Sequence, residues 1–445
     1  TNEKRVMNKK LADEIKKEYE RRFKPGAHFV AGKTPIMASG KDFDHREMVA
    51  ITEAVLDSWW TEGRFAAAFE KKFAAFIGAP VCVTTTSGSS ANLLAVAALT
   101  SYHLGERRLR PGDEVITLAA GFPTTINPLI LYQLVPVFAD IDRGTYNVNI
   151  TALEQSVSPR TRAVFLPHNI GNPFNVEAVQ KICKKHNLWL IEDCCDALGS
   201  TYHGKQVGSF GDLSTFSFYA GHHMAMGEGG AVVSKNERLG SIIRSIRDWG
   251  REYWFRTGED AKLDTGLGSK EKSHLPPDYD HKFLFSEIGY NLKITDMQAA
   301  LGLAQLKKLP QFTKRRQSNF AYLHKTISPF AKFLELPVAE KHSDPSWFGY
   351  LITVREQAPF TRREFIDYLH NHGIITRMFL AGNVTKQPYF QTYAVPHRIG
   401  AAGLATTDMV MNRSFWIGLY HGITKEQRSH IAAMVQSFLR SYYKS

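Results

Sequence analysis

The sequence predicts an α/β protein whose central sheet is mainly parallel. Between about residues 49 and 310, short β-rich runs alternate with stretches of helical length. The β-rich runs are apolar almost throughout, as in strands that helices cover on both faces. Of the 445 residues, 43% are hydrophobic and 22% are charged, which is typical of a soluble globular protein with a sizeable core.

The expected elements follow one another in a regular order. The chain should begin with a helix and an irregular arm, residues 1–48, with a Pro/Gly-rich exit from the helix. The β-rich runs that we expect to form strands are 81–86, 113–118, 135–140, 162–167 and 188–193. The stretches that we expect to form helices between them are 89–102, 124–134 and 176–186.

The second half of the chain predicts a smaller domain. Residues 251–282 are polar and too long for an ordinary connection, and loops of this length are usually functional or disordered. Residues 294–327 then have helical spacing and lead into an α+β region. We therefore expect an N-terminal helix and arm over 1–48, a large domain over 49–310 and a small domain over 311–445.

Composition also limits the classes of molecule that the protein is expected to bind. The net charge is +12, but no zinc-finger, RRM-like or basic-zipper pattern accompanies it, so we expect no nucleic-acid partner; an anionic small substrate would suit this charge. Four cysteines make no disulfide framework, and we find no secretory segment and no apolar run near the ~20 residues that span a bilayer. We expect a cytoplasmic protein without membrane contact.

A candidate phosphate site lies at the turn between the first expected strand and the helix that follows it. The residues at this turn are Ser87, Gly88 and Ser89. Free backbone N–H groups and the positive end of the helix dipole would hold a phosphate there. Small residues also form ordinary helix caps, so the motif alone leaves both interpretations open.

Two further side chains follow strand ends and suit a planar, nitrogen-containing cofactor. Asp193 ends the run 188–193, where its carboxylate could pair with a pyridinium nitrogen and keep it protonated. Phe122 follows another strand end, where its ring could stack on the cofactor. The alternatives are a helix cap for Asp193 and a core position for Phe122.

These pieces occur in the chain order of a known family. From about residue 35 onward the sequence resembles the DegT/DnrJ/EryC1/StrS sugar aminotransferases, which are fold-type I pyridoxal-phosphate enzymes with an aspartate aminotransferase-like fold. In that family a serine, a phenylalanine, a short spacer, a lysine and a Gly-Glu-Gly-Gly segment hold the coenzyme. Ser217, Phe218 and residues 227–230 match this pattern, but His222 occupies the lysine position.

The histidine changes the chemistry that the resemblance implies. A lysine amine holds the coenzyme as a Schiff base, whereas imidazole forms no such bond. Pyridoxamine phosphate (PMP), bound non-covalently, would then condense with a keto sugar through its own amine. His222, as a histidine with a pKa near neutrality, would remove the proton from the coenzyme's C4′ carbon, and the neighbouring hydroxyl would leave. The alternative is a structural role for His222. For the adjacent His223 we favour a structural role.

The same histidine is typical of the nucleotide-sugar 3-dehydratases within the family. The resemblance includes the CDP-4-keto-6-deoxyglucose 3-dehydratases, through motifs such as "IEDCCDALGSTY" and "GYNLKITDMQAA". It implies a homodimer with the coenzyme at the subunit interface, where Asn291 would reach the partner's phosphate. Arg377, Asn383 and Lys386 are weaker candidates for holding the substrate's diphosphate, since basic surface residues are common.

The sequence lacks cysteines that the CDP enzymes use to bind an iron–sulfur cluster, so we do not predict this cofactor. Those enzymes hold a two-iron two-sulfur cluster on four cysteines, and the same spacing counted from Cys195 falls on Tyr253, Phe255 and Leu263. Phenol and hydrocarbon side chains cannot replace thiolates. We therefore expect no metal and no cluster, and an amino donor such as glutamate would restore PMP, as the resemblance to the GDP-4-keto-6-deoxymannose 3-dehydratases suggests.

The predicted function is thus a PMP-dependent, cluster-free 3-dehydratase of an NDP-4-keto-6-deoxyhexose, of the kind that serves deoxysugar and lipopolysaccharide O-antigen biosynthesis. One alternative couples the dehydration to a separate reductase or to another fate of the intermediate, which the altered loop 251–282 motivates. A second is a sugar aminotransferase that uses Lys205 or Lys235. A third is a non-catalytic protein that binds a sugar nucleotide or nucleic acid.

Overall fold

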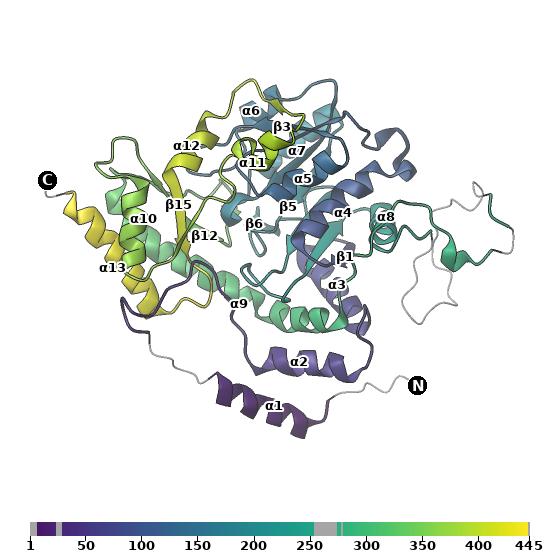
Figure 1. Ribbon diagram of the computed structural model, residues 1–445, viewed down its shortest axis with the longest axis horizontal. Helices are drawn as coiled ribbons and strands as arrows, with labels where there is room; N and C mark the ends of the chain where they lie inside the picture. Colours follow the sequence, from purple (N-terminus) through teal and green to yellow (C-terminus); the bar gives the residue numbers. More distant parts are fainter. Residues whose placement is uncertain (1–6, 24–28, 253–273, 277–278, 444–445) are drawn as a thin grey trace.

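The computed structural model describes residues 7–23, 29–252, 274–276 and 279–443 (Figure 1). Its α-helices are α1 Lys9–Arg22, α2 His45–Leu56, α3 Arg64–Ile77, α4 Gly88–Thr100, α5 Pro123–Leu131, α6 Ile150–Gln155, α7 Val176–His186, α8 Glu237–Arg247, α9 Asp296–Ile327, α10 Arg362–Asn371, α11 Pro388–Thr392, α12 Ala405–Arg413 and α13 Lys425–Ser441. Within these residues no helix is both long and apolar enough to cross a membrane.

An eight-stranded sheet forms the centre of the molecule, in the order β1-β9-β8-β5-β4-β2-β3-β14. Its strands are β1 Val81–Thr85, β2 Glu114–Leu118, β3 Val135–Ala139, β4 Thr161–Pro167, β5 Trp189–Asp193, β8 Leu213–Ser217, β9 Gly230–Ser234 and β14 Arg398–Ile399. Only β9 pairs antiparallel with its neighbours β1 and β8, and the other pairs are parallel. The five strands expected from the sequence are all present, and the mainly parallel sheet is confirmed.

The strands are apolar throughout because the sheet is buried on both faces. In β4, Ala163 and Phe165 pack into one hydrophobic cluster with residues of α4 and α8. Val164 and Leu166 point the other way, into a second cluster that includes α7 and the C-terminal region. Successive side chains of a strand alternate between faces, so both sets must be apolar when helices cover each side.

The C-terminal region adds a second, antiparallel sheet with strands in the order β10-β12-β15-β13. These strands are β10 Leu334–Glu335, β12 Gly349–Val354, β15 Ser414–Gly418 and β13 Thr376–Met378, and α10 and α13 lie beside them at the left of Figure 1. A small sheet of β11 Ser343–Asp344, β6 Thr201–Tyr202 and β7 Lys205–Gln206 completes the strands of the described residues.

Two elements of the structure connect the large and the small domain that we predicted from the sequence. Helix α9 runs unbroken through residue 310, where we predicted a domain boundary. Strand β14 belongs to the C-terminal region but pairs with β3, so it forms an edge of the large sheet. The three-part division of the chain stays a prediction.

The N-terminal region holds helix α1 and an arm, residues 29–44, that leads into α2. Helix α1 packs on α2, which packs on α9, as the lower part of Figure 1 shows. The Tyr19 hydroxyl donates to the Phe43 carbonyl oxygen at 2.9 Å, which ties α1 to the arm. The arm then runs past the C-terminal sheet, where Ile36 forms a bridge with Ile374. This course carries Ser39 to the candidate site.

Candidate active site

A cavity of about 610 Å³ opens where the strands of the large sheet end. Its lining comes from the starts of α4 and α5, the turn after β5 and the loop after β8. The C-terminal region supplies the opposite wall, through side chains on and near β12, β13 and β15. Ligands of open α/β sheets bind at such carboxyl ends, so this is the candidate active site.

Its phosphate corner is built by the β1–α4 turn. Ser87 caps α4, and its hydroxyl oxygen accepts from the Ser90 backbone N–H at 3.1 Å. Gly88 and Ser89 line the cavity together with Ser217. A Cβ on Gly88 would lie 2.5 Å from the Ser217 Cβ, so only glycine leaves this corner open. Ser87 therefore shapes the helix start, while its neighbours face the cavity.

Asp193 lies on the cavity wall at the end of β5, surrounded by hydrogen-bond donors. Its Oδ2 accepts from the Asn92 amide at 3.0 Å and the Thr125 hydroxyl at 2.7 Å. Its Oδ1 accepts from the Cys195 backbone N–H at 3.1 Å. The Thr215 hydroxyl in turn donates to Asn92 Oδ1 at 2.6 Å, which fixes the direction of the amide. Three donors therefore fix the orientation of the carboxylate.

Phe122 projects into the cavity rather than into the core. It precedes α5, lines the cavity and is 53% exposed. This exposure excludes the core alternative that the sequence left open. The ring is therefore accessible to a planar ligand, while Asp193 approaches the same cavity from β5.

His222 lines the cavity from the loop after β8. Its Nδ1 lies 2.9 Å from the Cys195 carbonyl oxygen. A carbonyl only accepts, so Nδ1 carries the proton of the neutral ring and Nε2 keeps a free lone pair. Burial is the main cause that lowers the pKa of His222 to about 4. The Arg316 cation acts in the same direction, while the hydrogen bond to Cys195 and the charge of Asp193 oppose the shift. We expected a pKa near neutrality; the desolvation of the ring accounts for the difference.

His223 faces away from the cavity lining. It is fully buried, and one ring nitrogen donates to the Ser346 carbonyl oxygen. Burial lowers its pKa well below the usual range, so the ring is neutral. These contacts support the structural role that we favoured for His223.

The predicted substrate residues separate into two groups. Arg377 lines the cavity from β13. Asn383 and Lys386 do not line it: the Asn383 amide donates to Asp408 at 2.7 Å, and the Lys386 ammonium pairs with the same carboxylate at 2.7 Å. Asn291 likewise lies outside the lining, in a bridge with Asp248. Its predicted role concerns the partner's site and stays a prediction.

With this geometry established, a family model for the DegT/DnrJ/EryC1/StrS aminotransferases matches residues 41–436. The chain belongs to this family. The predicted fold, a fold-type I aminotransferase-like α/β fold, is also confirmed. The solved structure of the Escherichia coli GDP-4-keto-6-deoxy-D-mannose-3-dehydratase with bound hydrated PLP matches with a TM-score of 0.82 at 28% identity. That match covers 90% of this chain and 100% of the other.

Curated relatives within the family include dehydratases. The chain is 50% identical to the lipopolysaccharide biosynthesis protein RfbH of Salmonella typhimurium, covering 92% of this chain and 93% of the relative. It is 48% identical to a dTDP-4-dehydro-2,6-dideoxy-D-glucose 3-dehydratase of Saccharopolyspora spinosa, covering 92% and 88%. It is 34% identical to the GDP-4-keto-6-deoxy-D-mannose 3-dehydratase of Yersinia pseudotuberculosis, covering 77% and 84%.

Sequence reasoning missed several residues of this family member's cavity. Asp196 lies three residues after Asp193, and Tyr219 directly follows the matched Phe218. Proximity in the chain was the only signal for either residue. Phe348 and Trp416 line the cavity from the C-terminal sheet, where nothing in the sequence connects them with β5. Arg316 is buried in α9 and donates to the His222 carbonyl oxygen at 3.2 Å.

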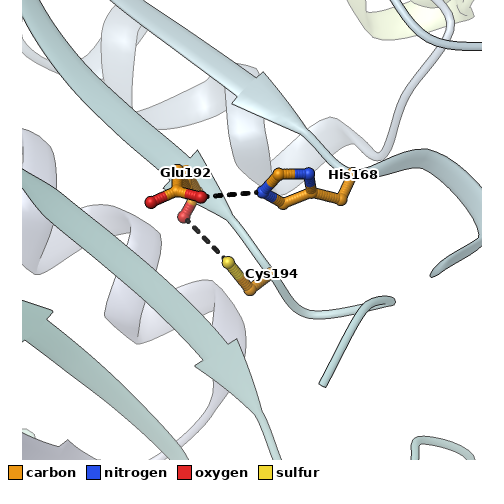
Figure 2. A group of neighbouring side chains, drawn as sticks. All are labelled: His168, Glu192 and Cys194. Carbon is orange, nitrogen blue, oxygen red and sulfur yellow. Dashed lines mark hydrogen bonds and ion pairs between the residues drawn. The ribbon is translucent and has the colours of Figure 1, made fainter. Parts of the chain in front are cut away.

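Figure 2 shows three buried side chains beside the cavity whose donor atoms are close enough to suggest a metal site: His168, Glu192 and Cys194. Their hydrogen bonds already use these atoms. His168 Nδ1 accepts from the Phe174 backbone N–H at 3.2 Å, so His168 Nε2 donates to Glu192 at 3.0 Å. Glu192 also accepts from three backbone N–H groups, those of residues 208, 210 and 211. The group is a hydrogen-bonded support for β5 and does not fit a metal ion.

Cys195 lines the cavity. Burial raises the pKa of its thiol well above the usual range, and Asp193 adds to the rise. The other cluster positions, Tyr253, Phe255 and Leu263, lie outside the described residues, as does most of the loop 251–282. The absence of an iron–sulfur cluster therefore stays a prediction.

Proposed function

We propose that this chain is a PMP-dependent 3-dehydratase of an NDP-4-keto-6-deoxyhexose that works without an iron–sulfur cluster. The observation that carries the proposal is His222, whose Nε2 has a free lone pair in the cavity at the position where the family's aminotransferases carry a lysine. Among the residues that the structure describes, no lysine lines this cavity. The dehydratase names of two curated relatives and of a solved structure support the same reaction class.

The residues of the cavity fit a pyridoxamine ring and its phosphate. The space beside Gly88, which a Cβ would fill, suits the phosphate, with Ser89 and Ser217 as hydroxyl donors. Asp193 presents its carboxylate for the ring nitrogen, and Phe122 presents its face to the ring. When bound, the coenzyme supplies an amine for the sugar ketone and a ring that accepts electrons.

His222 supplies the proton chemistry in this proposal. Because its pKa is lowered to about 4, the ring is neutral at physiological pH and ready to accept a proton at Nε2. The resulting imidazolium is a strong acid, so the same nitrogen can return the proton to the departing hydroxyl. The Cys195 carbonyl holds the ring through Nδ1, so that Nε2 faces the cavity during both steps.

Of the three candidates for the substrate's diphosphate, Arg377 is the one that lines the cavity. For Asn383 and Lys386 the geometry supports a structural role instead, because Asp408 engages both. We propose Arg377 alone of the three as a diphosphate contact.

The homodimer is part of the proposal. Asn291 lies outside the cavity of its own chain, and the segment before it exposes apolar side chains that an interface would cover: Phe283, Phe285 and Ile288. A second copy would bring its Asn291 to the phosphate corner of this chain. Light scattering on the purified protein checks the dimer, and an Asn291→Ala variant checks the coenzyme contact.

An ammonia assay tests the proposed reaction. The PMP-loaded protein is mixed with 4-keto-6-deoxy sugar nucleotides and glutamate, and no reductase is added. We expect a sugar product that is one oxygen atom lighter, with one ammonia and one 2-oxoglutarate formed per turnover. A product that keeps its 3-hydroxyl contradicts the proposal. A strict need for a reductase selects the coupled alternative, and an aminated sugar selects the aminotransferase.

The aminotransferase alternative also requires a lysine that reaches the coenzyme. Lys205 lies exposed on β7, and the Lys235 ammonium donates to the Phe210 carbonyl oxygen at 2.8 Å. Neither residue lines the cavity. This placement favours the dehydratase.

A further inference from the structure

The cavity contains a second carboxylic acid that the proposed mechanism does not use. Asp196 lines the cavity three residues after Asp193, and its side chain is 16% exposed. The two carboxyl groups differ in their partners. Asp193 accepts three hydrogen bonds, whereas no donor bonds the Asp196 carboxyl among the described residues. The His222 ring lies beside it, with Nδ1 3.6 Å from Asp196 Oδ1.

Two oxygen atoms thus lie on one side of the His222 ring, and the cavity lies on its other side. Nδ1 faces the Cys195 carbonyl and the Asp196 carboxyl. The Nε2 atom is the site that takes up a proton. Once it does, the positive charge spreads over the whole ring, and the carboxyl group beside Nδ1 is placed to offset it.

A buried cation makes this compensation necessary. Arg316 lies on α9, is 1% exposed and donates to three backbone carbonyl oxygens, those of His222, Trp347 and Phe348, at 3.1–3.2 Å. No carboxylate hydrogen-bonds to this guanidinium among the described residues. Its positive charge opposes protonation of His222, and the Asp196 carboxyl raises the pKa of the Arg316 guanidinium.

Four ionisable groups face Asp196. Asp193 and Cys195 lie on its own turn, His222 lies on the loop after β8 and Arg316 lies on α9. Burial first and the charge of Asp193 second raise the pKa of Asp196 to about 7, although the Arg316 cation opposes the rise. The Cys195 thiol and the His222 ring are neutral at this pH. Asp196 is therefore the group that changes its charge near neutrality.

We propose that the Asp196 carboxylate offsets the charge that His222 acquires when Nε2 takes a proton, and thereby strengthens His222 as a base. The inference rests on the proposed dehydratase function. In the step concerned, a carbon–hydrogen bond breaks, the Nε2–H bond forms and the electron pair stays with the coenzyme. Asp196 neither gains nor loses a proton in it. Acting only through His222, Asp196 is a positioning residue.

Kinetics of Asp196→Asn test the charge while the size is kept. With PMP-loaded protein we expect kcat of dehydration at pH 8 to fall at least ~10-fold and KM to change less than ~3-fold, because substrate contacts remain. In the wild type, kcat should rise between pH 6 and 8 as Asp196 ionises. This rise should vanish in Asp196→Asn and return in Asp196→Glu. Asp344→Asn, an exposed position outside the cavity, is the control and should resemble the wild type.

A spectroscopic readout separates this inference from the proposed function. In PMP-loaded protein labelled with ¹³C-histidine, the His222 resonance is assigned by its loss in His222→Gln. We expect an inflection near pH 7 that reports Asp196 and is absent in Asp196→Asn. If this inflection and the kinetic pH profile are unchanged in Asp196→Asn, the inference is overturned. If the wild type forms no dehydrated sugar, the proposed function fails, while the resonance still decides on Asp196.

Discussion

Gly88 lies against Ser217 so closely that a Cβ on residue 88 would stand 2.5 Å from the Ser217 Cβ and 3.0 Å from its Oγ. This contact joins the start of α4 to the end of β8, the two elements that frame the phosphate corner. A substitution at either position must therefore change the space that we assign to the phosphate.

Gly88→Ala should weaken PMP binding on the order of 10-fold or more, since overpacking typically costs ~1–3 kcal/mol. Fluorescence titration with PMP measures the loss, and thermal unfolding measures the strain. Gly88→Ala/Ser217→Gly removes the clash and should recover most of the melting temperature. Unchanged PMP affinity in Gly88→Ala would place the phosphate elsewhere.

His222→Lys should convert the reversible coenzyme into a covalent one. A primary amine at this position forms a Schiff base with pyridoxal phosphate, so dehydration should be abolished. Borohydride reduction followed by peptide mass analysis should show the adduct on residue 222. His222→Gln is the matched control, expected to lose dehydration without any adduct. Retained dehydration by His222→Lys would refute the assignment of the base.

Asp193→Asn should slow coenzyme turnover and weaken its binding, because an amide cannot offer a negative charge to the ring nitrogen. It would also turn an N–H group toward the donors of Asn92 and Thr125. Hydrogen bonds to charged groups contribute ~1.5–3 kcal/mol, so we expect roughly 10- to 100-fold weaker binding. Thr125→Val removes one donor and should have a smaller effect. Equal losses in both variants would argue against a special role of the charge.

His421→Phe should make the protein less sensitive to acid. His421 stacks on Phe312 at 3.8 Å, and neither ring nitrogen has a hydrogen-bond partner among the described residues. Burial lowers its pKa to about 2, while the unfolded chain binds a proton near pH 6.5. Stability is therefore lost as the pH falls below about 6.5. Melting temperatures at pH 7.5 and 5 should diverge less in the variant, and an equal drop would contradict this.

Removal of metal ions should leave the reaction unchanged. His168 and Glu192 already use their donor atoms in hydrogen bonds, and three of the four cluster positions lack cysteine. Treatment with a chelator followed by gel filtration should not alter the dehydration rate. Elemental analysis of the untreated protein should show no stoichiometric iron. Iron near two atoms per chain, with activity lost on its removal, would contradict the cluster-free proposal.

The sequence predicted those parts of the site that depend on neighbouring residues in the chain. Asp193, Phe122 and the residues around Gly88 each follow a strand whose apolar run is visible in the chain, so their meeting at one sheet edge could be inferred. His222 could be inferred only by comparison with a family pattern. Strands β8 and β9 flank this loop, yet their mixed, short runs gave no signal that we used.

The rest of the site depends on contacts across the fold. Phe348 and Trp416 reach the cavity because the C-terminal sheet packs against the large one, and no local spacing encodes that packing. Arg316 has the pattern of an ordinary helix residue; only the structure shows its guanidinium among carbonyl oxygens. The pKa of His222 was misjudged for the same reason, since burial is a property of the assembled fold.

Strand β14 has a consequence for engineering. It comes from the C-terminal region yet closes an edge of the large sheet beside β3, and Arg398 on it pairs with Glu114 on β2 at 2.7 Å. A truncated gene ending before residue 398 would leave the β3 border unprotected and the buried Glu114 without one of its cations. Chimeras that exchange C-terminal halves between relatives must therefore carry a compatible outer strand.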